Sequence, residues 1–426
     1  MNRWQDITGK LNYGLYLVLA ALLPFPQTFL RYACVVWFVC WLLEGRWLKR
    51  PLPLHENRVA IPFLLFGLWY AWKALSFFWS PDAGAWSSQM ERYLTFGLMV
   101  LPGLWGVNGY YDWRQAGRVL AVSCFIAMPA YMLWMAILFR HPEIVPHLHL
   151  HEEWIQHNQW WTFFAENISH FKHRLFLCSV ELLGVVAALQ VWRDKKWLLA
   201  LTLPVMLASI PMTGSRQALL TALVMGVAAL LMRIPRQYRW RYGTGVVMLG
   251  GILCYGVFAL HPRMKQIDIS TFSEFRNLSY NHDVRLNIWG AALQHPGDYA
   301  AYGLGAGQSP DYIAGRFKEA HFDYFVQVKH HAHNQYLEEL MEIGIPGLLL
   351  FIAAWLSVLL CARGEGKFSA LMFTLLYMTN MLTDCMFAKF CGVALWAVGM
   401  MFICLQYDPS PSPPTPSAAN LAGCRG

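Results

Sequence analysis

The stretch Lys329–Phe351, "KHHAHNQYLEELMEIGIPGLLLF", joins a titratable run directly to an apolar run. Its first half contains three histidines and three glutamates, and its second half opens an uncharged segment that continues to about residue 362. An apolar segment of this kind is typical of a helix that crosses the hydrocarbon core of a bilayer. The stretch therefore predicts a membrane-spanning helix with polar chemistry at its entrance.

Similar apolar segments recur along the whole chain. Of its 426 residues, 57% are hydrophobic and only 14% are charged, which is less charge than a soluble protein of this size carries. We therefore predict an all-α polytopic membrane protein with about twelve transmembrane helices. The expected spans are 11–25, 29–45, 59–79, 89–107, 117–139, 174–192, 197–212, 217–233, 243–261, 346–362, 368–385 and 390–407.

Lysines and arginines gather at alternate boundaries of these spans, for example at 46–58, 193–196 and 233–241. The intervening short loops, such as "SPDAGAWSS" at 80–88, are nearly free of positive charge. Cytoplasmic loops carry the excess of positive charge, so the pattern predicts that both termini are cytoplasmic. The net charge of +8 mostly reflects this topology, so we expect membrane lipids, and no nucleic acid, as partners.

The spans divide the chain into four parts. Residues 1–261 carry spans one to nine and an outer loop at about 140–173. Residues 262–344 form a large outer loop, long enough to hold helices of its own. Residues 345–407 carry spans ten to twelve. The tail 408–426 is rich in proline, serine and alanine, a composition typical of disorder.

Two arginines stand at helix entrances on the outer side. Arg216 follows Ser215, a natural N-cap, at the start of span eight. Arg285 falls in the first turn of a helix that Asp283 can cap and that stops before Pro296. A positive side chain beside free backbone N–H groups attracts an anion such as phosphate. The alternatives are an interfacial arginine that reaches toward the headgroups and an exposed arginine on an amphipathic helix.

His333 stands at a third entrance. Asn334 can cap a short helix that ends at Gly344, after which Pro346 begins span ten. Histidine is well suited to accept a proton near neutral pH. The alternatives are a hydrogen-bonded interfacial histidine and a metal site. For the metal site, the ligands would come from His330, His331, His333 and Glu338, although no standard ligand spacing closes it.

Other charged residues are open to two interpretations. Arg92, at the start of span four, and Lys73, inside span three, are functional candidates because charges within membranes are costly. Pairing with an acid such as Glu91 is the alternative. The strip "HLHLHEEWIQH" at 147–157 resembles an interfacial segment more than a site. We expect Glu338, Glu339 and Glu342 either to keep their helix solvated or to contact the residues that form the site.

Taken together, two arginines suited to phosphate and one histidine suited to proton transfer face outward at the membrane surface. The planar guanidinium group matches phosphate oxygens in pairs. These residues predict, as the ligand, a lipid that bears a pyrophosphate.

The segments around these three residues resemble those of a known family. His333-Asn334, nine residues, and then Gly344-Ile345-Pro346-Gly347 are similar to the motif His-[Asn/Ser/Gln]-x9-Gly-x-x-[Gly/Thr/Tyr] of bacterial O-antigen ligases. The sequence also looks like the related O-antigen polymerases and protein O-oligosaccharyltransferases. "SRQALL" resembles the Arg-x3-Leu element of the family at Arg216 and Leu220. "VRLNIWGAALQHP", followed by "GLGAGQ", resembles the segment with a second functional arginine, here Arg285.

The resemblance implies a glycosyltransferase of C-type architecture in the bacterial inner membrane, with its active site facing the periplasm. It implies an undecaprenyl pyrophosphate-linked glycan as donor and lipid A-core as acceptor, with inversion at the sugar and neither metal nor cofactor. His333 would be the general base, and Arg216 and Arg285 would bind the pyrophosphate. The possible supporting residues are Asn334, Arg92, Gln308 and Tyr302.

Two kinds of alternative stay open. An O-antigen polymerase or a protein O-oligosaccharyltransferase would use the same donor with another acceptor. A polytopic transporter would suit twelve spans, but transporter sites lie near the midplane, and the ionisable residues here lie at helix entrances.

Overall fold

The computed structural model describes residues 3–48, 60–107, 109–141, 144, 160–260, 284–322, 326–327 and 329–407. Every regular element within these ranges is a helix, so the predicted all-α class is confirmed. The histidine strip at 147–157, the predicted cap Asp283 and the tail 408–426 lie outside the described residues.

A helix lies at each of the twelve predicted spans. They are α1 (Arg3–Leu22), α2 (Gln27–Glu44), α3 (Ala60–Leu75), α4 (Ala83–Trp105), α5 (Trp113–Arg140), α8 (Arg174–Val191), α9 (Lys196–Leu207) with α10 (Ser209–Thr213), α11 (Arg216–Arg233), α12 (Arg239–Leu260), α16 (Gln335–Cys361), α17 (Gly366–Met381) and α18 (Phe390–Cys404). The connections between these helices contribute α7 (Trp160–Asn167), α13 (Val284–Leu293) and α14 (Ser309–Glu319).

Six of the described helical segments are long and apolar enough to cross a membrane. They are 60–78, 113–140, 174–191, 196–213, 216–233 and 335–361. Helix α18 is apolar but shorter. A multi-pass membrane protein is therefore supported, while the number of twelve spans stays a prediction.

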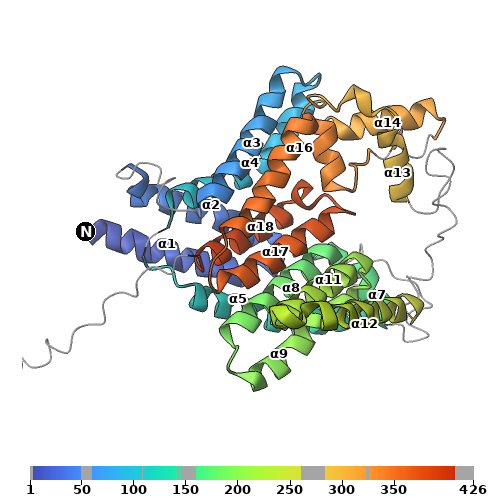
Figure 1. Ribbon diagram of the computed structural model, residues 1–426. Helices are drawn as coiled ribbons and strands as arrows, with labels where there is room; N and C mark the ends of the chain where they lie inside the picture. The colour runs from blue at the N-terminus through green and yellow to red at the C-terminus, as the bar shows by residue number, and fades with distance from the viewer. Residues whose placement is uncertain are drawn as a thin grey trace, which may run out of the picture.

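An aromatic core joins the N-terminal and C-terminal helices. Trp396 of α18 stacks on Phe96 of α4 with ring centroids 4.0 Å apart, and its ring also meets Phe66 of α3 edge-on. Trp355 of α16 packs edge-on against Phe66. Buried aromatic pairs add to the stability that burial of their area supplies. Helix α16 lies along α3 and also packs against α17, and α18 packs against α4 and α17 (Figure 1).

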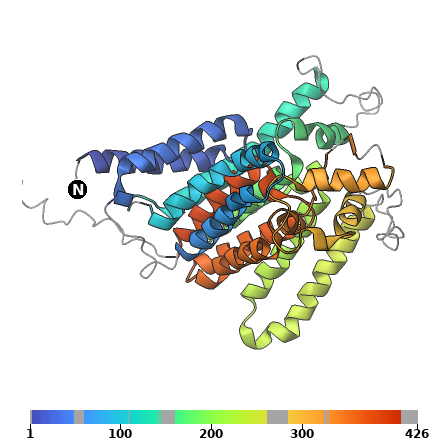
Figure 2. The same ribbon diagram turned by 90° about the horizontal axis from the view of Figure 1, so that it is seen from above.

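The short helices between α12 and α16 gather at one end of the molecule. Helices α13 and α14 lie at the end opposite the N-terminal end of α1 (Figures 1 and 2). Ile288, Ile313 and Phe317 form a small apolar cluster with Ala332 and Met341, so this end packs on the start of α16. The cluster brings α13 and α14 against the segment that carries His333.

Helix α16 is interrupted where the sequence predicts a stop. Gly344 has φ 67° and ψ −171°, a backbone conformation outside the helical region. A Cβ atom at this position would lie 2.7 Å from the backbone of Ala301 and Tyr302, so both space and conformation require glycine. The break separates the polar first turns of α16 from its apolar span.

Candidate functional site

The segment before α16 is held by Asn334. Its Oδ1 atom accepts a hydrogen bond from the backbone N–H of Leu337 at 3.0 Å, which confirms the predicted N-cap. Its Nδ2 atom donates to the backbone oxygen of Leu382 at 3.0 Å, just beyond the end of α17. One side chain thus ties the entrance of α16 to the connection between α17 and α18.

His333 has an unusual backbone conformation. Its φ of 47° lies in the left-handed region, which costs a non-glycine residue about 1–3 kcal/mol. The backbone N–H of His333 donates to the Nδ1 atom of His331 at 3.2 Å. The two imidazole rings lie with centroids 4.2 Å apart. This tight turn directs the His333 ring toward the segment that follows α17.

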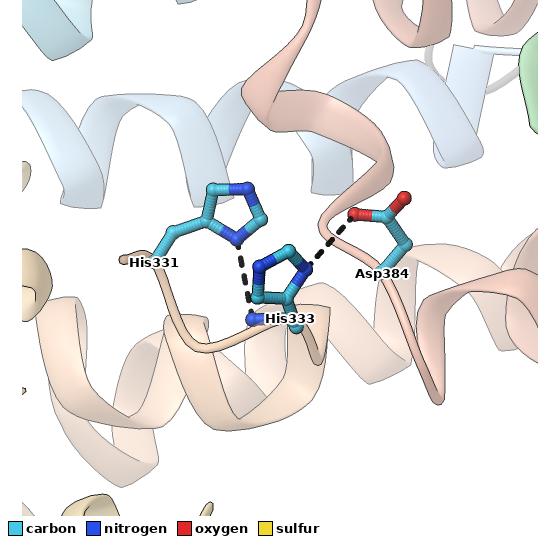
Figure 3. Close-up of side chains that lie close together, drawn as sticks. All are labelled: His331, His333 and Asp384. Carbon is cyan, nitrogen blue, oxygen red and sulfur yellow. Dashed lines mark hydrogen bonds and ion pairs between the residues drawn. The ribbon is translucent and has the colours of Figure 1, made fainter. Parts of the chain in front are cut away.

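On that segment, Asp384 faces His333 (Figure 3). The His333 Nδ1 atom lies 3.8 Å from the Asp384 Oδ1 atom, and the Asp384 side chain is only 9% exposed. The distance is too long for a hydrogen bond, and Nδ1 of His333 is buried without a hydrogen-bond partner among the described residues. The arrangement therefore pairs an imidazole with a carboxylate that can stabilise its protonated form.

Burial keeps His333 neutral. The pKa of His333 is lowered to about 3, mainly by burial, with smaller lowering from the neighbouring His331, Arg285 and His330 and an opposing effect of Asp384. Burial also lowers the pKa of His331, with contributions from Lys389 and Arg92. A neutral imidazole has one nitrogen lone pair, so the His333 ring can accept a proton at neutral pH, whereas the Nδ1 lone pair of His331 already accepts the His333 N–H.

Arg285 reaches the site through α13. It lies in the first turn of this helix, as predicted, and is partly exposed. Trp289, one turn later, donates from Nε1 to the backbone oxygen of Ala332 at 2.9 Å. This contact places α13 directly against the residue that precedes His333. Arg285 thus lies close enough to His333 to lower its pKa.

Arg216 begins α11, as predicted, and Ser215 caps the helix by accepting from the backbone N–H of Ala218 at 3.3 Å. The next residue, Gln217, donates to the backbone oxygen of Thr379 and accepts from the hydroxyl of Thr383. Because Thr383 adjoins Asp384, the entrance of α11 is held beside the segment that faces His333. The Arg216 side chain is partly exposed there.

Sequence reasoning missed Asp384, His173 and Lys389. His173 precedes α8, and its pKa is lowered to about 4, mainly by burial and in smaller part by Lys389, Arg174 and Arg285, against Asp384. Asp384 acts on both His173 and His333. The signal that could have found it is its isolation, because it is the only carboxylate between Glu365 and Asp408 and ends an apolar segment.

The remaining candidates have different surroundings. Gln308 is buried and donates from Nε2 to the hydroxyl of Ser80 and to the backbone oxygen of Asp82, each at 2.9 Å. Tyr302 is 64% exposed at the surface of the outer segment. Arg92 is exposed near His331. Their roles in a reaction stay predictions.

For a metal site, the structure offers a different set of ligands from the set that the sequence suggests. Glu338 accepts hydrogen bonds from the Ser309 hydroxyl at 2.6 Å and the Ala332 N–H at 2.7 Å, so its oxygens are engaged away from the histidines. Ligand atoms of His331, His333 and Asp384 instead lie within 4.8 Å of one another. Two imidazoles and a carboxylate are a donor set that zinc uses.

The comparison with protein families agrees with the motifs. Residues 182–352 match the family model described as O-antigen ligase, Wzy_C. The matched segment includes Arg216, Arg285 and His333, and it ends before Asp384. No curated protein matches the chain. The family match confirms the resemblance and supports a membrane glycosyltransferase of the O-antigen ligase and polymerase type.

Proposed function

We propose that this chain, which carries an O-antigen ligase family domain, transfers a glycan from undecaprenyl pyrophosphate to a sugar of lipid A-core. The observation that carries the proposal is the pairing of His333 with Asp384 in the field of Arg285, at the entrance of an apolar helix. The reaction takes place at the periplasmic face of the inner membrane, with both termini of the chain in the cytoplasm.

His333 acts as the general base. Its Nδ1 atom faces Asp384, so Nε2 is the atom that receives the proton of the acceptor hydroxyl. The acceptor oxygen forms a bond to the anomeric carbon as the bond from that carbon to the pyrophosphate oxygen breaks. Attack from the face opposite the leaving group inverts the anomeric configuration. Asp384 stabilises the imidazolium that forms.

Arg216 and Arg285 hold the pyrophosphate. The leaving group gains negative charge as the glycosidic bond breaks, and a fixed guanidinium stabilises that charge most in the transition state. The donor is already activated, so the chemistry needs neither a nucleotide nor a metal. The start of α13 lies against the His333 segment, which supports a shared site for the acceptor hydroxyl and the leaving group.

Donor binding also tunes the base. In the free protein, burial and neighbouring positive charges hold the pKa of His333 at about 3. An anionic pyrophosphate beside Arg285 offsets those charges and raises the pKa of His333, since a nearby negative charge favours the protonated form. The base thereby becomes stronger only when the donor is present.

The acceptor separates this proposal from its alternatives. An O-antigen polymerase would extend another lipid-linked glycan with the same residues, and a protein O-oligosaccharyltransferase would modify serine or threonine. Because all three enzymes use the same kind of donor, the geometry around His333 suits the ligase, the polymerase and the protein O-oligosaccharyltransferase equally. The motif around His333 resembles the ligases, and the matched family model carries the same description.

The test combines purified protein, undecaprenyl pyrophosphate-linked glycan and lipid A-core in the presence of EDTA. We expect glycan-extended lipid A-core from the wild type and a loss of about 10²- to 10⁴-fold for His333→Ala, the contribution typical of a positioned base. His295→Ala is the matched control, because it makes the same change at an exposed histidine of the outer segment.

Each other outcome decides against part of the proposal. Longer lipid-linked chains from donor alone, without transfer to lipid A-core, would identify a polymerase. Unchanged transfer by His333→Ala would remove His333 from the reaction. Donor that crosses the membrane without any bond exchange would favour a transporter.

A further inference from the structure

The first turns of α16 bury an unusual number of polar groups on one face. Gln335, Glu338, Glu339 and Glu342 are each at most 3% exposed. Their spacing places them on one side of the helix. Burial of a carboxylate is costly unless it is paired and hydrogen-bonded, so each of these groups requires a defined partner.

Lys73 of α3 supplies the opposing charge. Its Nζ atom lies 2.7 Å from Glu342 and 3.1 Å from Glu339, and all three side chains are fully buried. Glu339 also accepts from Trp69 Nε1 at 2.9 Å and from Gln335 Nε2 at 2.6 Å. The sequence alternative for Lys73, pairing with an acid, is the one that the structure contains. This pairing anchors the polar face of α16 against α3.

Glu338 extends the network to the histidine segment. One carboxylate oxygen accepts from the backbone N–H of Ala332 at 2.7 Å, and the other accepts from the hydroxyl of Ser309 at 2.6 Å. Ala332 lies between His331 and His333 in the chain. The bond to its backbone therefore restrains the strained turn that sets the direction of the His333 ring.

Gln335 extends the network to the carboxylate segment. Its Oε1 atom accepts from the backbone N–H of Phe387 at 3.0 Å, and Phe387 follows Asp384 in the short connection between α17 and α18. The amide of Gln335 is itself held by Glu339. Two residues of one buried helix face thus hold the two chain segments that bring His333 and Asp384 together.

We propose that Glu338 and Gln335 are positioning residues that set the separation between His333 and Asp384. The assignment rests on the proposed role of His333 as base. Neither side chain reaches the imidazole, since each acts through a backbone amide of a neighbouring residue. A small displacement of a reacting group lowers the rate strongly, so a fixed frame behind the pair increases turnover without adding affinity for the donor.

The first experiment compares Glu338→Ala with Glu338→Gln. The glutamine keeps an oxygen for the Ala332 N–H and directs its amide to the Ser309 hydroxyl, which can accept as well as donate. We expect kcat to fall about 10- to 100-fold in the alanine variant with the donor KM within twofold, and to recover within about threefold in the glutamine variant. Glu319→Ala, at an exposed glutamate of α14, is the matched control.

A second readout does not depend on turnover. Hydrogen–deuterium exchange of the purified full chain follows the backbone amide of Ala332 directly. We expect faster exchange at this amide in Glu338→Ala than in the wild type or Glu338→Gln. For Gln335→Leu, we expect faster exchange at Phe387 and a comparable fall in kcat.

The outcomes separate this inference from the proposed function. Unchanged exchange at Ala332, or full kcat in Glu338→Ala, would overturn the positioning role. A rise in donor KM without a change in kcat would also overturn it. Wild-type protein that transfers no glycan to any acceptor would instead overturn the proposed function, while the exchange data would still report on the frame. If Glu338→Ala does not fold, the test falls on Glu338→Gln, and a kcat more than about threefold below that of the wild type would decide against the role.

Discussion

The Nδ1 atom of His333 lies 3.8 Å from the Oδ1 atom of Asp384, although the whole length of helices α16 and α17 separates the two residues in the sequence. His333 precedes α16 and Asp384 follows α17. The connection between these helices lies at their other ends, so a helical hairpin brings the two residues together. The pair is thus a product of helix packing, and it places an imidazole near a carboxylate that can stabilise the protonated form of the ring.

The first prediction concerns Asp384. Replacing it with asparagine keeps the shape of the side chain but removes the charge that opposes an imidazolium on His333. We expect kcat to fall at least about 10-fold, because preorganised charge contributes strongly where charge develops. Steady-state transfer to lipid A-core measures the effect, with Asp298→Asn on the outer surface as control. Transfer at the wild-type rate would show that the pair has no part in the reaction.

The second prediction concerns the phosphate contacts. Arg216→Lys and Arg285→Lys keep a positive charge but lose the planar group that binds two oxygens at once. We expect each variant to reduce kcat/KM for the donor by about 10-fold or more, since a bidentate charge-assisted contact is lost. The control is Arg316→Lys, because Arg316 forms surface ion pairs on α14. Normal ligation by both lysine variants would rule out the phosphate clamp.

The third prediction concerns pH. In the free protein the pKa of His333 is lowered to about 3, so the base is neutral and active at every pH well above that value. Bound pyrophosphate raises the pKa, so the base in the complex becomes protonated at a higher pH. As pH falls from 8 to 5, we expect kcat to fall while kcat/KM for the donor changes little, because the two parameters report the complex and the free enzyme.

If kcat and kcat/KM for the donor fell in parallel as the pH is lowered, the prediction would be contradicted, since the donor would then not change the pKa of the base. His333→Ala provides the reference, because its remaining activity should lack the acid limb of kcat. The donor's own ionisation is the same in both proteins and cancels in the comparison.

The fourth prediction concerns metal ions. Ligand atoms of His331, His333 and Asp384 lie close enough to share a zinc ion, which would occupy a nitrogen of the base. We expect EDTA to leave wild-type transfer unchanged and added Zn²⁺ to inhibit it reversibly. His331→Ala should require more Zn²⁺ for half-inhibition of its own activity, because it lacks one ligand. Loss of activity in EDTA would instead indicate that the reaction needs a metal.

Local features of the site follow from the sequence alone. Ser215 and Asn334 cap their helices as predicted, and Gly344 interrupts α16 as predicted. Arg216 and Arg285 stand in the first turns of α11 and α13. These features depend on residues within a few positions of one another, so side-chain chemistry and helical periodicity are sufficient to predict them.

The contacts behind and beside His333 could not be predicted in the same way. The sequence marks Lys73 as a costly charge, but only the packing of α3 along α16 shows that its partners are Glu339 and Glu342. Likewise, the position of Glu338 in its helix does not reveal its hydrogen-bond partners, and only the tertiary structure shows that they are Ala332 and Ser309. Their partners depend on which helices pack together.

The sequence by itself determined the all-helical class and the family resemblance, and it predicted His333, Arg216 and Arg285 as residues of the proposed chemistry. Hydropathy and motif spacing are properties of neighbouring residues, and both can be read along the chain. The tertiary structure alone decided that Asp384 faces His333 and that one buried face of α16 holds both of their segments. These contacts join residues that are far apart in the sequence, and a buried charge is tolerated only where the folded chain brings its partner.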